Sequence, residues 1–334
     1  MIVNVKKAIL HILDGNSGIT VFSDNEIDLT DVPVASFLTT HIEKIFDDPA
    51  LRKGEFNDNS GFKYHMGQYK SGSEDLHALS LFVGEHLYEN ISHSEKITSS
   101  DVVVCECTIS EASYIAVLKF DNKSGFVHKV EKTEDGVCNE IINHFAILPS
   151  PTQKISECAF INLEDFSIKY KGKKLTVEGE KIDLIADGLL ECIFDFSTKE
   201  SFNAVEKIAR SISTEYGNDA ISTNARVKQY VKETAVPSEN IDVKEMADSV
   251  FSDSVSAKSD FIEKVRESNI PETFEMNDYI TKRVNKNLKI VTDTGIEISF
   301  PAEYYKDDEN IFIINNDDGT LSIQINNIGE IINK

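Results

Sequence analysis

Alternating apolar and polar residues predict several antiparallel strands in the first half of the chain. Successive side chains of a strand point to opposite faces of a sheet, so a period of two residues is typical of a half-buried strand. Clusters of Gly, Asn, Asp and Ser separate these runs and predict turns between them. The predicted strands span residues 101–110, 114–120, 125–132, 141–148, 157–161, 165–170 and 174–177.

Apolar residues at helical spacing predict two helices ahead of these strands. The first begins near Pro33, because proline is favoured in the first turn of a helix. The second runs from about Glu74 to Ile91. The intervening segment 51–73 is polar and rich in Gly, and we expect a long irregular connection there.

Turn-forming residues between apolar runs predict two hairpins. The runs AILHIL and ITVFS flank Gly15-Asn16-Ser17-Gly18, and Lys171-Gly172-Lys173 lies between the predicted strands 165–170 and 174–177. Glu134-Asp135-Gly136 supplies a further turn. The first part of the chain is therefore predicted to be an α+β domain with an antiparallel sheet.

Beyond residue 180 the pattern changes first to helices and then back to strands. Predicted helices span residues 202–216, 220–236, 241–251 and 256–270. Four short strands follow at 288–293, 295–301, 310–316 and 320–326. We therefore expect an α+β fold with three parts: a mixed domain at 1–180, a helical region at 181–275 and a small antiparallel β module at 276–334.

The charge of the chain restricts how it can bind nucleic acid. Its 334 residues contain 34 Lys and Arg against 57 Asp and Glu, a formal net charge of −23. An acidic surface repels phosphate, whereas non-specific DNA affinity comes mainly from Lys and Arg that displace counterions. DNA binding by this chain would therefore require a local basic patch, a partner protein or divalent counterions.

Composition and motifs also argue against several other classes of protein. An uncharged apolar run of about 18 residues is missing, so no membrane span is predicted, and we interpret the N-terminus as a strand or helix rather than a signal peptide. Five scattered cysteines fit reduced thiols in a cytoplasm. Cys105 and Cys107 share one strand face with Val103 and are interpreted as buried apolar groups.

Catalytic, metal and cofactor motifs are equally missing from the sequence. Phosphate-binding loops, a nucleotide-binding glycine pattern, a nucleophile elbow and paired His–Cys spacings do not occur. The acidic runs 307–310 and 317–318 lack the spacing of a calcium loop and are favoured turn residues instead. We predict no catalytic residue, no bound metal and no cofactor.

Several segments together resemble one bacterial protein family. They are KKAILHILD, HIEKIFDD, LRKGEF, SECAFINLEDFSIKYKGKK and the closing run TFEMNDYITKRVNKNLKIVTDTGIEISFPAEYYKDDENIFIINNDDGTLSIQI. In content and order these segments are similar to the 37-kDa nucleoid-associated protein family (NdpA-like) over essentially the whole chain. The resemblance implies a bacterial cytoplasmic protein of the nucleoid, DNA binding with modest sequence preference, and contact with type II topoisomerases.

Two basic windows are the candidate DNA contacts, and each sums to +3 in a chain of −23. The first window, 165–174, is predicted to be a lysine-tipped hairpin that reaches phosphates, or alternatively an edge strand protected by its lysines. In the second, 278–289, three lysines share one face if the segment is helical, although this could be an ordinary solvated face. The candidates are Lys169, Lys171, Lys173, Lys174, Lys282, Arg283, Lys286 and Lys289.

Two weaker candidates lie on the predicted helices. Arg226, Lys228 and Lys232 occupy the helix 220–236, where ordinary surface charge is the simpler interpretation. The helices 241–251 and 256–270 have the order of a helix-turn-helix, but the second mixes acidic and basic residues and does not have the composition of a clear recognition helix.

The sequence leaves two functions open. In the first, the protein is a non-enzymatic, DNA-binding homodimer whose symmetry doubles the basic surface, with apolar helices such as 202–216 in the interface. In the second, it is an acidic adaptor, or a DNA mimic, that binds DNA-processing enzymes such as type II topoisomerases. A nuclease or other hydrolase is a third possibility, which would require metal-dependent turnover.

Overall fold

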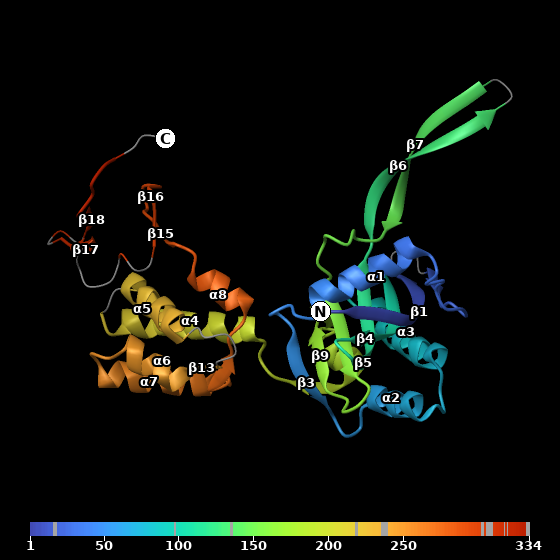
Figure 1. The fold of residues 1–334 in the computed structure, drawn as a ribbon, viewed down its shortest axis with the longest axis horizontal. Coiled ribbons are helices and arrows are strands. Elements are labelled where there is room, and N and C mark those ends of the chain that lie inside the picture. Colours follow the sequence, from blue (N-terminus) through green and yellow to red (C-terminus); the bar gives the residue numbers. More distant parts are fainter. Residues whose placement is uncertain are drawn as a thin grey trace. The chain divides into compact units, whose positions relative to one another are not determined.

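The computed structural model describes residues 1–15, 19–96, 98–133, 136–217, 220–234, 240–301, 304, 310–316, 318 and 320–331. The chain forms two compact units, Met1–Asp195 (unit 1) and Phe196–Lys334 (unit 2) (Figure 1). Together they confirm the α+β class, with a large antiparallel sheet, central helices and small C-terminal hairpins. The predicted three-part division into domains stays a prediction.

Unit 1 is built on an eight-stranded antiparallel sheet in the order β12-β3-β9-β8-β5-β4-β1-β2. The predicted hairpin near the N-terminus is confirmed, because β1 pairs with β2 from Ile12–Val21 to Asp14–Ile19. Its turn at residues 16–18 lies outside the described residues. The strands are β1 (Val3–Asp14), β2 (Ile19–Val21), β3 (Arg52–Phe56), β4 (Ser99–Ile109), β5 (Ala112–Asp121), β8 (Glu157–Asn162), β9 (Ile168–Lys171) and β12 (Cys192–Phe194).

Helices cover both faces of this sheet, because its central strands are apolar on both sides. Helix α1 (Val32–Ile45) packs on the face that carries Val103, Cys105 and Cys107, which confirms that these three side chains share one buried face. The opposite face, with Val102 and Val104, is covered by three helical elements. These are α2 (Gly61–Ser71), α3 (Leu76–Ser92) and the short π-helix η1 (Ala186–Leu190).

The expectation of an irregular connection at 51–73 is wrong, because this segment contains both β3 and α2. The strand is held by partners remote in sequence, pairing with β9 on one side and β12 on the other. Helix α2 begins after Ser60, whose Oγ accepts a hydrogen bond from the Lys63 amide at 3.0 Å. Phe62 and Met66 then place the apolar side of α2 in the core.

The predicted hairpin around Gly172 is also wrong. Strand β9 pairs with β3 and β8 in the main sheet, whereas β10 (Lys174–Val177) pairs with β11 (Glu180–Asp183) in a separate two-stranded sheet. The chain thus passes from one sheet to another at Gly172 instead of reversing. The backbone of Gly172 lies so close to the carboxylate of Asp183 that a Cβ at this position would collide with it. This close approach explains the glycine.

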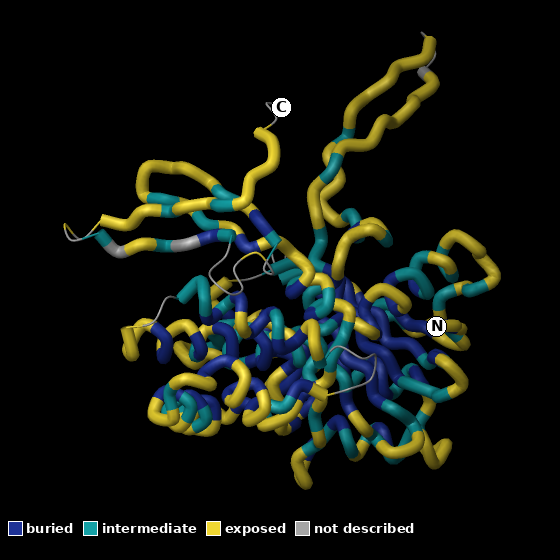
Figure 2. The backbone as a smooth tube through the Cα atoms, turned by 60° about the vertical axis from the view of Figure 1, so that its left-hand side comes forward, coloured by how far each residue is buried: buried dark blue, intermediate teal, exposed yellow. Residues whose placement is uncertain are grey.

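A long two-stranded ribbon projects from unit 1 between β5 and β8 (Figure 1). It consists of β6 (Lys123–Thr133) and β7 (Gly136–Ile147), and we call it the arm. The two predicted strands here are therefore confirmed, while Glu134 and Asp135 of the predicted turn lie outside the described residues. Most of the arm is exposed, in contrast to the sheet below it (Figure 2).

Unit 2 is centred on a helical core. The apolar face of α4 includes Phe202, Val205 and Ile212, and all three side chains are fully buried against the other helices of the unit. The proposal that this helix face forms a dimer interface is therefore wrong. The elements of this core are α4 (Thr198–Glu215), α5 (Ala220–Thr234), β13 (Asn240–Asp242), α6 (Val243–Val250), α7 (Val255–Glu267), β14 (Thr273–Glu275) and α8 (Asp278–Val284).

The last part of unit 2 contains the four short strands predicted from the sequence. They form two separate hairpins, β15 (Leu288–Val291) with β16 (Glu297–Phe300) and β17 (Ile311–Asn315) with β18 (Leu321–Ile325). A small apolar cluster links Leu288, Phe300 and Ile311. Most of the acidic turn residues predicted at 307–310 and 317–318 lie outside the described residues.

Helix α2 offers a direct test of the unit 1 core. Its Phe62 is fully buried, whereas Tyr64 is 62% exposed. We expect Phe62→Ala to lower the free energy of unfolding by about 3–5 kcal/mol, because it leaves a cavity in the core. Tyr64→Ala is the matched control and should leave the midpoint of urea unfolding, followed by circular dichroism, nearly unchanged. Equal effects of the two substitutions would show that α2 does not pack on the sheet through Phe62.

Candidate nucleic-acid interface

The first basic window is largely neutralised within unit 1. The ammonium group of Lys169 lies 4.0 Å from the ring centroid of Phe46. Lys171 is half-buried and its Nζ lies 3.3 Å from Oδ2 of Asp48. Burial raises the pKa of Asp48, but the Ala50 amide and Lys171 outweigh this effect, and the pKa lies below its ordinary value.

Lys173 belongs to a partly buried ion cluster at the base of the arm. Lys119 is almost completely buried, and its Nζ lies 2.7 Å from both Asp121 Oδ1 and Glu157 Oε2. Lys173 contacts the other oxygen of Asp121 at 2.7 Å. Lys119 and Glu157 are also register partners on β5 and β8. We call Lys119, Asp121, Glu157 and Lys173 the arm-base ion cluster.

The pKa shifts in this cluster follow from mutual pairing. Burial opposes the charge of Lys119, yet Glu157 and Asp121 outweigh it and raise the pKa of Lys119. For Asp121, burial favours the neutral acid, but Lys119 and Lys173 keep the pKa below its ordinary value. Lys173 therefore forms an ion pair with Asp121 at the end of β5. Lys174, by contrast, is exposed at the start of β10.

The second window does not form the continuous helix that its lysine spacing predicts. Helix α8 ends at Val284, so Lys286 lies beyond it and Lys289 lies on β15. The helix ends at the C-cap residue Asn285, and Leu288 beyond it lies in the small cluster that it shares with Phe300. The expectation of one lysine face over 282–289 is therefore wrong. Lys289 instead forms an ion pair with Glu297 across the hairpin, at 2.8 Å.

Part of this window nevertheless joins cations from two other helices around Glu206 of α4. The side chain of Glu206 is 3% exposed, and its Oε2 accepts hydrogen bonds from Arg283 Nε at 3.0 Å and Nη2 at 2.5 Å. Arg210, one turn along α4, approaches the same oxygen at 4.0 Å. Lys228 of α5 lies within electrostatic range of Glu206 and Arg283.

Helix α5 completes this group and fixes the end of α8. Lys228 is 6% exposed and its Nζ donates to the carbonyl oxygen of Lys286 at 2.7 Å. Lys232 and Lys286 both act electrostatically on Lys228, and both are exposed. We call this set the Glu206 cation cluster: Arg210, Lys228, Lys232, Arg283 and Lys286.

The pKa shifts show how crowded the positive charge is. Burial lowers the pKa of Lys228, Glu206 opposes this, and Arg283, Lys232 and Lys286 lower the pKa further. Burial alone would lower the pKa of Arg283. The hydrogen bonds of Arg283 to Glu206 and the attraction between the two charges outweigh burial and raise this pKa. Arg210, Arg283 and Lys228 thus interact with Glu206, and Lys232 and Lys286 add positive charge next to Lys228, in a strongly acidic chain.

Sequence reasoning found only part of this cluster. Arg283 and Lys286 were in the second window, and the i, i+4 spacing of Lys228 and Lys232 marked one face of α5. Arg210 was missed, since it comes from a third helix and its position beside Glu206 depends on packing. Lys282 remains nearby in sequence but is 78% exposed and loosely paired with Asp278 at 3.7 Å.

The helix-turn-helix candidate carries its cations in ion pairs. On α7, Lys258 contacts Asp248, Lys264 contacts Glu215 and Arg266 contacts Glu272. Arg226 of α5 is paired with Asp253 in the same way, at 3.1 Å. These pairs leave α7 with little positive charge to offer a phosphate, so it is a weaker candidate than the Glu206 cation cluster.

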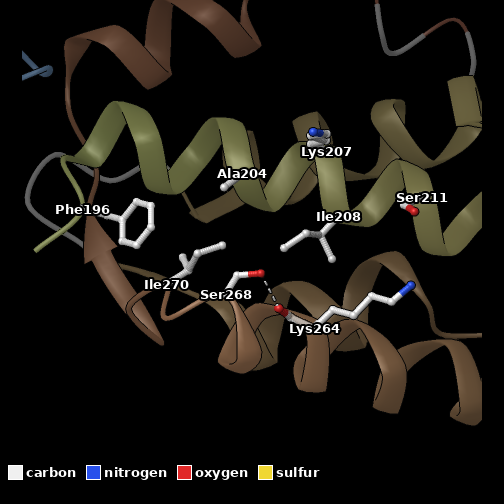
Figure 3. Close-up of a pocket in the computed structure, with 8 residues that line it drawn as sticks. All are labelled: Phe196, Ala204, Lys207, Ile208, Ser211, Lys264, Ser268 and Ile270. Carbon is white, nitrogen blue, oxygen red and sulfur yellow. Dashed lines mark hydrogen bonds between the residues drawn. The ribbon is translucent and has the colours of Figure 1, made fainter. Parts of the chain in front are cut away.

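A cleft of about 320 Å³ lies between α4 and α7 (Figure 3). Phe196, Ile208 and Ile270 form its apolar wall, and Ser268 donates to the Lys264 carbonyl at 2.8 Å. The remaining lining residues are Ala204, Lys207, Ser211 and Lys264. Its described lining contains no carboxylate, histidine or cysteine that could act as a general base.

Within the described ranges, no three His, Cys, Asp or Glu side chains come together in a way that could hold a metal ion. Among the helices that the structure describes, none is both long and apolar enough to cross a membrane.

Glu206 can be tested through its effect on unit 2. We expect Glu206→Gln to lower the free energy of unfolding by about 3 kcal/mol, because it leaves Arg283 and Lys228 without their buried counter-charge. Asp278→Asn removes an equal charge from an exposed pair and should leave the urea midpoint unchanged. Similar midpoints for both variants would contradict a central role of Glu206 in the cluster.

Comparison with known proteins adds an independent line of evidence. A search of curated proteins finds no significant match. The family model described as nucleoid-associated protein YejK, however, matches residues 9–332, nearly the whole chain. The resemblance seen in the sequence is thereby confirmed, and the chain belongs to this family of nucleoid-associated proteins.

Proposed function

We propose that this protein binds DNA directly and without catalysis, and that the Glu206 cation cluster is its principal DNA contact. The observation that carries the proposal is the convergence of five cations from α4, α5 and the α8 region in a chain of net charge −23. Membership in a nucleoid-associated family supports it. Lys282, exposed on α8, extends the same contact.

The chemistry of the cluster favours binding with little sequence preference. Lys and Arg contacts to phosphate release condensed counterions, which gives affinity that depends on salt but carries no sequence information. In this proposal the first window contributes less, because Lys171 and Lys173 already neutralise carboxylates of unit 1. Lys169, Lys174 and Lys289 are secondary contacts.

Two copies of the chain would present two such clusters to one DNA duplex. We therefore propose a homodimer, in which the second contact follows the first at high effective concentration. In this proposal the protein acts on the bacterial nucleoid, and type II topoisomerases are the partner enzymes that the family resemblance implies. These enzymes use the same DNA, so shared binding to one duplex is sufficient to bring them together.

The DNA contact is tested by neutralising three exposed lysines at the cluster. We expect Lys232→Gln, Lys282→Gln and Lys286→Gln together to weaken binding and to make the dependence of log K on log salt shallower by about 2–3, since each phosphate contact contributes about 0.9. Fluorescence anisotropy with a labelled duplex of mixed sequence, titrated at several salt concentrations, measures both quantities.

The matched control removes equal charge from the region of the first window. Lys173→Gln, Lys174→Gln and Lys181→Gln change three exposed lysines at β9–β11. We expect this variant to retain most of the affinity and to make the slope shallower by at most about 1, since Lys174 is its one secondary contact. Equal losses in the two triple variants would show that net charge matters rather than the cluster, and a loss confined to the control would move the contact to the first window.

The acidic charge favours a second candidate, an adaptor or DNA mimic that binds basic surfaces of DNA-processing enzymes. The net charge of −23 is the observation behind it. Pure protein would then show no mobility shift with DNA, while association with type II topoisomerases would survive nuclease treatment. A shift by pure protein, together with loss of the association after nuclease treatment, would exclude the adaptor.

A further inference from the structure

We propose that one face of the arm is the surface through which two copies of this chain associate. The arm is the ribbon of β6 and β7 that projects from unit 1 (Figure 1). The inference rests on the homodimer in the proposed function and assigns it a surface. It is independent of which residues contact DNA.

The register of the arm separates its side chains into two different faces. Cross-strand partners lie on the same side of a ribbon. One face, here called the apolar face, carries the pairs Phe126–Asn143, His128–Ile141, Val130–Asn139 and Lys132–Val137, and by alternation Phe145. The other face carries Lys129 opposite Glu140 and next to Glu131, with Nζ of Lys129 3.3 Å from Glu131 Oε2.

Five large apolar side chains on the apolar face are open to solvent. Soluble proteins rarely leave a continuous row of this kind uncovered, and a larger patch marks an interaction site. A two-stranded ribbon is also marginally stable by itself in water, so a covering partner stabilises it. The exposed fractions are Phe126 75%, Val130 56%, Val137 64%, Ile141 80% and Phe145 73%.

The area of this face fits the requirement of a dimer. With roughly 200 Å² for a phenylalanine and roughly 100 Å² for a valine or isoleucine side chain, the exposed fractions leave about 500 Å² of apolar surface per arm. Two such faces packed together bury about 1,000 Å², the lower limit for a specific interface, before the polar side chains are added. A face that packs on its own copy closes the assembly at two chains.

Charge also favours a second copy. The chain as a whole carries −23, so two copies repel each other over most of their surface. The described part of the arm is nearly neutral, with Lys123, Lys129 and Lys132 against Glu131 and Glu140. On the apolar face itself Lys132 lies near the tip, where its ammonium group can stay in water. The arm is thus a place where two acidic molecules meet with little repulsion.

DNA is a poorer match to the apolar face. Phosphate contacts require several Lys or Arg side chains, and of the described charged residues this face holds Lys132 alone. Its central residues are a row of aliphatic and aromatic groups with two asparagines and a histidine. This composition resembles the core of a homodimer interface more than a groove-binding surface.

The proposal is tested by measuring the mass of the full chain with sedimentation equilibrium over a dilution series without DNA. The arm-face variant is Phe126→Thr with Ile141→Thr, which keeps strand propensity while it removes two large apolar groups. We expect a wild-type dimer and at least about 30-fold weaker association of the variant, as for the loss of central interface residues.

The matched control is Val127→Thr with Ile142→Thr, a cross-strand pair on the opposite face of the arm. This variant should dimerise like the wild type. Far-UV circular dichroism confirms that both variants are folded. The lysine variants of the DNA experiment should also remain dimeric, so that failure of the DNA contact and failure of the arm interface are distinguishable.

A second measurement uses the wild-type chain and does not depend on variants. Cys138 is exposed on the face opposite to the apolar face, whereas the other four cysteines are buried. A nitroxide label therefore reacts at one position, and dipolar electron paramagnetic resonance should show a coupling between the two labels of a dimer. The coupling should disappear in the Phe126→Thr/Ile141→Thr variant.

Three outcomes would overturn the proposal. They are a monomeric wild type, a dimer that the arm-face variant leaves intact, and an arm-face variant of unchanged mass that no longer binds DNA. The last result would assign the apolar face to DNA.

Discussion

The central strands of unit 1 are apolar on both faces, and most of the unit follows from this constraint. Strands β4, β5 and β8 have long runs of consecutive buried residues, so neither face of the sheet can be left in water. Helix α1 covers one face, and α2, α3 and η1 cover the other. On β5 and β8 the charged groups lie at or near the strand ends, where Lys119, Asp121 and Glu157 pair with one another.

The positions of the carboxylates explain why the two basic windows differ in how far their lysines are paired. In unit 1, Lys171 and Lys173 lie where strands end next to Asp48 and Asp121, and the desolvated carboxylates hold them. In unit 2, helices α4, α5 and α8 bring Arg210, Lys228 and Arg283 together at the buried carboxylate of Glu206. A lysine-rich run of sequence is thus a poor predictor of a positively charged surface. Whether its lysines remain available for phosphate depends on which carboxylates the fold places next to them.

Local patterns predicted the elements well and their partners poorly. Alternation and helical spacing were sufficient for the central strands, α1, α3 and the C-terminal hairpins, since each signal lies within one segment. Strand β3 was missed because its stability comes from β9 and β12, remote in sequence. The turn residues around Gly172 were a valid local signal, but the two flanking strands pair elsewhere. Arg210 joined the candidate site only through packing.

The attachment of the arm gives it a mechanical property. Strand β6 follows β5 directly across Asn122, whereas residues 148–156 connect β7 to β8, and the arm-base ion cluster ties β5 to β8 at the base of the arm. The Asn122 amide also donates to the Ser99 carbonyl of β4 at 3.0 Å. A force on the tip is therefore passed first to the strands that meet at the base of the arm, β4, β5 and β8. If two copies associate through their arms as proposed, tension between them is borne by the sheet of unit 1.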